Sequence, residues 1–73
     1  MQAKRPTLLQ RTEAWLRETL ADGPLAAAVV IERAEATGWI ATKTLRRAKA
    51  NIGVISRKSR DAMGGWSWEL PKD

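Results

Sequence analysis

The sequence predicts a small, mostly helical α+β domain in which three helices are followed by a β-hairpin. Two observations carry this prediction. Apolar residues recur at helical spacing in three segments between Leu8 and Ile52, and Gly or Pro follows each segment. The last segment, Trp66-Ser-Trp-Glu-Leu70, instead alternates large apolar with polar residues, which is the period of a half-buried strand.

The first predicted helix begins after the N-terminal residues 1–6, which we expect to form a flexible basic arm before a single domain at 7–73. Its N-cap candidates are Thr7 and Thr12. Asp22-Gly-Pro24 ends it, because Gly accepts the C′ conformation and Pro cannot continue a helix. One face of this helix collects the residues Leu8, Thr12, Trp15, Leu16, Thr19 and Leu20.

The second predicted helix covers about 26–37, and Leu25 just before it is a candidate for a short strand or a staple. Gly38 ends this helix. Its apolar stripe consists of Ala27, Val30, Ile31 and Ala34. The pattern Ala34-x-x-x-Gly38 is typical of a helix-turn-helix, since a steep crossing needs a small residue at the contact and a turn residue that tolerates positive φ.

The third predicted helix starts near Ala41 or Thr42, and Gly53 terminates it. Its inner face is expected to be Leu45, Ala48 and Ile52, and its outer face Lys43, Arg46, Arg47 and Ala50. A strand at 54–56, a loop at 57–65 and the strand from Trp66 then form a hairpin. This order is that of a winged helix-turn-helix with a C-terminal β-hairpin wing and a possible third strand at Leu25.

Charge is distributed unevenly along the chain. Residues 1–37 hold five basic and five acidic residues, so the net charge of +5 lies in the second half. The stretch 38–60 holds seven basic residues and no acid: Lys43, Arg46, Arg47, Lys49, Arg57, Lys58 and Arg60. A localised basic surface is typical of proteins that bind a phosphate backbone. The alternative is a solvated charged face, but such a face usually mixes both signs.

The tryptophans are expected mainly in the core. Trp15 lies on the apolar face of the first helix, and Trp68 shares a strand face with Trp66 and Leu70. Stacking of Trp66 on single-stranded bases is a less favoured alternative. Trp39 is expected to pack as a staple against the third helix or, if exposed, to contact a partner.

The composition argues against catalysis and against metal or cofactor binding. Cys and His are absent, which removes the usual nucleophile–base pairs and the commonest transition-metal ligands. The acidic residues form no carboxylate motif, and no Gly-rich phosphate loop follows a strand. We therefore expect no enzyme, no cofactor and no small-molecule ligand. No apolar run or leader pattern predicts a membrane segment, and the expected location is cytoplasmic, in the nucleoid.

Several short motifs occur in an order that resembles a known family. They are Ala14-Trp15-Leu16, Leu20-Ala-Asp-Gly-Pro24, Ala34-x-x-x-Gly38, Thr44-Leu-Arg-Arg-Ala-Lys49, Gly53-Val54 and Trp66-x-Trp-x-Leu-Pro71. Together they resemble the winged-helix DNA-binding domain at the C-terminus of plasmid- and phage-type AAA ATPases and primase–helicases. The resemblance implies a DNA-binding appendage with residues 44–49 in the recognition helix. The turn before Thr44 is one residue longer than the family pattern, and the chain contains no ATPase.

The leading hypothesis is binding of double-stranded DNA by a recognition helix at about 42–52 and a basic wing at 57–65, in plasmid- or phage-type replication, recombination or transcription regulation. The expected DNA-binding residues are Thr42, Lys43, Arg46, Arg47, Lys49, Ala50, Arg57, Lys58 and Arg60. Lys4 and Arg5 are expected to help at the backbone. One alternative is a protein-interaction module that binds itself or a replication ATPase, through Val29 and Trp39 if these are exposed. The other is binding of RNA or single strands.

Overall fold

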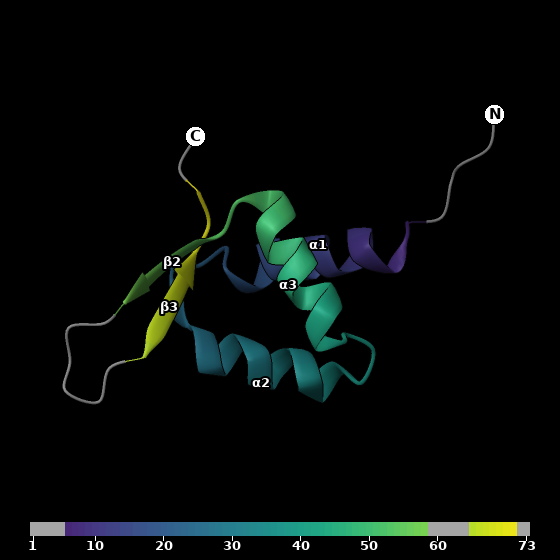
Figure 1. The fold of residues 1–73 in the computed structure, drawn as a ribbon, viewed down its shortest axis with the longest axis horizontal. Helices are drawn as coiled ribbons and strands as arrows, with labels where there is room; N and C mark the ends of the chain where they lie inside the picture. The colour runs from purple at the N-terminus through teal and green to yellow at the C-terminus, as the bar shows by residue number, and fades with distance from the viewer. Residues whose placement is uncertain (1–5, 59–64, 72–73) are drawn as a thin grey trace.

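The computed structural model describes residues 6–58 and 65–71, which form three helices and a three-stranded antiparallel sheet. The elements follow one another as α1 (Leu8–Thr19), β1 (Leu25–Ala26), α2 (Ala27–Thr37), α3 (Thr42–Ile52), β2 (Ile55–Lys58) and β3 (Trp66–Glu69). The strands lie in the order β1-β3-β2. Figure 1 shows α3 crossing α1, with α2 beside both and the β2–β3 hairpin at the end of the molecule away from the start of α1.

Helix α1 begins at a complete capping box. The Thr7 side chain accepts a hydrogen bond from the Gln10 backbone N–H, and the Gln10 side chain accepts one from the Thr7 backbone N–H. Of the two predicted caps, Thr7 is therefore the right one. Thr12 lies inside the helix, fully buried, where its hydroxyl donates to the Leu8 carbonyl at 2.8 Å. This bond satisfies the only buried polar side chain among the core residues described.

The predicted helix ends are confirmed at two glycines, whereas α1 ends at Thr19 with Leu20 as its C-cap, before the predicted stop at Asp22-Gly-Pro24. Gly38 after α2 has φ of 76° and Gly53 after α3 has φ of 74°, the left-handed conformation that favours glycine at a helix C-terminus. The short connection from Gly38 to α3 turns the chain sharply. Ile40, which lies in this connection, is buried in the core.

The sheet corrects one predicted boundary. Leu25 forms the predicted short strand, paired with Trp68. Residues Arg57 and Lys58, which the sequence places in the loop 57–65, belong to strand β2, where they pair with Ser67 and Trp66. The loop prediction is wrong at these two positions because the antiparallel ladder continues for two residues beyond Ser56, the predicted end of the strand. Their side chains are thus carried by regular sheet rather than by a hairpin tip.

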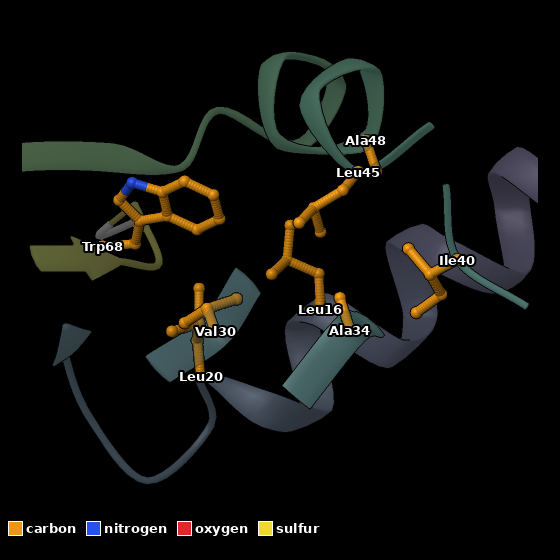
Figure 2. Close-up of a cluster of buried hydrophobic side chains, with 8 residues drawn as sticks. All are labelled: Leu16, Leu20, Val30, Ala34, Ile40, Leu45, Ala48 and Trp68. Carbon is orange, nitrogen blue, oxygen red and sulfur yellow. The ribbon is translucent and has the colours of Figure 1, made fainter. Parts of the chain in front are cut away.

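A single apolar cluster joins the helices to the sheet. Figure 2 shows Trp68 reaching from β3 toward side chains of all three helices. The buried members are Leu16, Leu20, Val30, Ala34, Ile40, Leu45, Ala48 and Trp68. The predicted core positions are confirmed for Leu45 and Ala48, with Ile52 partly buried against them.

Two predicted apolar positions lie outside this cluster. Leu8 is 48% exposed and Trp66 is 53% exposed. Trp66 shares the period of Trp68, but it pairs with Lys58 at the end of the ladder farthest from Ile55. Leu8 precedes Thr12 by one helical turn and lies at the start of α1. None of the helices in the described ranges has the length and apolar character needed to cross a membrane.

Candidate nucleic-acid interface

The outward face of α3 carries most of the predicted site. Leu45 and Ala48 anchor one side of the helix in the core. The residues on the opposite side of the helix therefore face solvent. The exposed residues on that side are Thr42, Lys43, Arg46, Arg47 and Ala50, as the sequence predicts. The helix therefore presents three cationic side chains within little more than one turn.

The start of α3 adds a further positive contribution. Ala41 is the N-cap and supplies no side-chain hydrogen bond, and the first turn contains no acidic residue. The backbone N–H groups of this turn are thus open to a polar or anionic partner, and the helix dipole is positive at this end. Lys43 lies in the same turn, so side-chain charge and helix dipole act together there.

Lys49 differs from the other cations of α3. It is half-buried, and its Nζ lies 4.9 Å from the ring centroid of Trp68, within the range of a cation–π contact. Lys49 thus bridges α3 and β3. This is a structural role that its position in the basic stretch does not reveal.

The hairpin cations have unequal surroundings. Arg57 is exposed on β2 and forms an ion pair through its Nε with the Oε1 of Glu69 on β3. Lys58 is exposed and pairs in the ladder with Trp66. Within 6–58 and 65–71 the Arg57–Glu69 pair is the one salt bridge, so none of Lys43, Arg46 and Arg47 is paired with a described carboxylate. Arg60, Lys4 and Arg5 lie outside the described residues.

Among the hollows that the described residues line, two border the cationic face of α3. The first, about 570 Å³, lies between the start of α1 and α3, and its lining consists of Thr7, Leu8, Leu9, Lys43, Thr44, Arg46 and Arg47. The second, about 370 Å³, lies between α2, α3 and β3, and its lining consists of Ile31, Thr42, Leu45, Arg46, Lys49, Ala50 and Trp68. Arg46 stands on the ridge between them.

The structure also brings together residues that no sequence pattern connects. The Arg11 guanidinium lies 4.9 Å from the ring centroid of Trp39, which is partly buried against the core. Asn51 donates a hydrogen bond to Glu13 at 3.1 Å. Leu8 and Leu9 meet the cations of α3 across the first hollow. Local patterns could not have indicated these contacts, because each joins residues 28 or more positions apart along the chain.

The site offers no place for a metal ion among the residues described, since no group of three His, Cys, Asp or Glu side chains lies together there. Comparison with family models, with curated proteins and with solved structures found no match to this chain.

Proposed function

We propose that this chain is a winged helix-turn-helix domain that binds double-stranded DNA, with α3 in the major groove and the β2–β3 hairpin beside the backbone. One observation carries the proposal: the outward face of α3 presents Lys43, Arg46 and Arg47 to solvent with no described carboxylate paired to them. A helix of this kind can reach both base edges and phosphates.

The chain path supports the same proposal. Three helices followed by a hairpin, with strands in the order β1-β3-β2, is the arrangement expected of a winged helix. In such a domain the turn between α2 and α3 sets the recognition helix on the surface, and the hairpin extends to one side. Figure 1 shows α3 crossing α1, with the chain continuing from the end of α3 into the hairpin.

The roles of the cations follow from their surroundings. Arg46 and Arg47 are the candidates for bidentate contacts to guanine or for phosphate contacts, and Thr42 and Lys43 contact either from the first turn. Lys58 contacts phosphate. Lys49 holds α3 against Trp68, and Arg57 is partly neutralised by Glu69. Both residues therefore contribute less to DNA affinity than their charge suggests.

The test is a titration of a fluorescein-labelled mixed-sequence duplex, followed by anisotropy. The variant with both Arg46→Ala and Arg47→Ala is expected to bind roughly tenfold or more weakly at moderate salt, because two phosphate neutralisations are lost. Arg17→Ala/Arg33→Ala is the matched control, since it removes two guanidinium groups from exposed positions of α1 and α2. Equal losses in the double variant and the control, or no duplex binding at all, would refute the proposal.

Salt dependence provides a second test. If about five or six phosphates are neutralised, log K falls against log salt with a slope of roughly −4 to −6. The Arg46→Ala/Arg47→Ala variant should flatten that slope by roughly two. An affinity that is independent of salt contradicts a backbone partner.

The single-strand alternative rests on the exposure of Trp66 beside Lys58. It predicts quenching of the Trp66 fluorescence by single-stranded oligonucleotides and no preference for duplex. The signal of the other three tryptophans is removed by comparison with Trp66→Leu. A role in plasmid- or phage-type replication, recombination or regulation is part of the proposal and depends on duplex binding.

A further inference from the structure

We propose that the hollow between the start of α1 and α3 is a docking groove for an acidic peptide segment that carries an apolar residue. The occupant is a segment of another protein. Its binding excludes DNA from α3, and that second clause rests on the proposed function. The groove is defined by Thr7, Leu8, Leu9, Lys43, Thr44, Arg46 and Arg47.

The apolar part of the groove includes Leu8, which is far more exposed than its neighbours on the same helix face. On the same helix face Thr12 and Leu16 are fully buried, whereas Leu8 is 48% exposed. The capping box of Thr7 and Gln10 fixes the first turn, so Leu8 is held on regular helix rather than on a frayed end. A rigid, half-covered leucine at the wall of a hollow is suited to receive an apolar side chain.

The polar part of the groove has one sign. Lys43, Arg46 and Arg47 line it, and none of the acidic side chains in 6–58 and 65–71 does. The first acidic residue of α1 is Glu13, which accepts a hydrogen bond from Asn51 at the far end of α3. It is thus held away from the cations of the groove. Arginine clusters beside an apolar wall select acidic segments with an apolar anchor.

Charge complementarity decides between possible occupants. A second copy of this chain has a net charge of +5, so it is repelled from a cationic groove at low salt. A duplex offers anions but does not need the leucine wall. An acidic segment with one apolar residue uses both halves of the lining, and it engages three of the cations proposed to contact DNA. Peptide and duplex therefore compete.

The probe is a fluorescein-labelled synthetic peptide of Asp and Glu residues with a central Leu-Trp pair, read by anisotropy against the full chain. Two comparison peptides serve as controls. In one, Ser replaces the Leu-Trp pair; in the other, Asn and Gln replace Asp and Glu. Leu8→Gln is expected to lower the affinity for the acidic Leu-Trp peptide roughly fivefold, because the peptide no longer buries the exposed half of a leucine side chain. Ile55→Gln, at an exposed position outside the groove, should leave it unchanged.

The duplex titration separates this proposal from the proposed function. Leu8→Gln should bind duplex as the parent does, while Arg46→Ala/Arg47→Ala should lose both ligands. Duplex binding without peptide binding overturns the groove alone, and peptide binding without duplex binding overturns the DNA proposal and the exclusion clause. Equal affinity for the peptide without Leu-Trp also overturns the groove, since the surface then attracts any anion.

Folding and self-association are checked on the same samples. Circular dichroism of Leu8→Gln must match the parent; if it does not, Leu8→Met, which keeps an apolar wall, should retain peptide binding while Leu8→Ala, which removes most of that wall, weakens it. Sedimentation velocity must show a monomer. A dimer that dissociates in Leu8→Gln would assign the groove to a second copy and overturn the proposed occupant.

Discussion

The ammonium of Lys49 lies 4.9 Å from the ring centroid of Trp68, and this contact ties α3 to the central strand of the sheet. Trp68 is 7% exposed and belongs to the core, so the lysine packs a charge against the apolar cluster. The packing of α3 against the sheet therefore includes a charged residue as well as apolar contacts.

We expect Lys49→Met to lower the free energy of unfolding by about 0.5–1 kcal/mol, since it keeps the apolar stem and removes only the cation over the ring. Urea denaturation followed by tryptophan fluorescence measures this. Lys43→Met, exposed on the same helix, is the control and should stay within about 0.5 kcal/mol of the parent. Duplex affinity should show the opposite order, with Lys43→Met losing more affinity than Lys49→Met. Equal stability of the two variants would contradict a structural role for Lys49.

Glu69 restrains the hairpin cation Arg57 by pairing with it. Glu69→Gln should tighten duplex binding by roughly two- to fivefold, because the guanidinium becomes free to contact phosphate and a negative charge beside the backbone is lost. Glu32→Gln removes the same charge from an exposed position of α2 and should have a smaller effect. The hairpin has no part in binding if the two variants bind alike.

Gly38 ends α2 with φ of 76°, and a β-carbon added at this position would meet no atom within 4 Å. Gly38→Ala therefore costs stability through backbone strain alone, about 1 kcal/mol. Gly65 also has open space but lies outside the left-handed region, so Gly65→Ala should be neutral or stabilising by about 0.4–1 kcal/mol. Thermal unfolding of the two variants tests the contrast, and a loss in Gly65→Ala equal to that in Gly38→Ala would contradict it.

Leu16 is fully buried where α1 meets the rest of the core. Leu16→Ala should cost about 2–5 kcal/mol, which is most of the stability of a domain this small. Leu8→Ala, on the same helix but half-exposed, should cost less than about 1 kcal/mol. Chemical denaturation gives both values. A similar loss in both variants would mean that Leu8 belongs to the core, and it would remove the apolar wall of the proposed groove.

The sequence by itself determined the elements that local chemistry controls. Helical spacing indicated the inner face of α3 at Leu45 and Ala48, and Gly38 and Gly53 marked helix ends because only glycine takes positive φ without strain. The alternation around Trp68 indicated its strand. The run of cations without acids indicated a basic surface, since the exposed side of α3 follows directly from its buried side.

The tertiary structure alone decided what each cation touches. Arg57 and Lys58 lie in a strand rather than a loop because cross-strand pairing continues to Trp66. The residues of one strand alone do not indicate how far that pairing extends. Lys49 meets Trp68, Arg57 meets Glu69, and Leu8 comes to lie across a groove from Arg47. These relationships join residues that are distant in sequence. They depend on how helices and strands pack, and residue spacing along one segment carries no information about that packing.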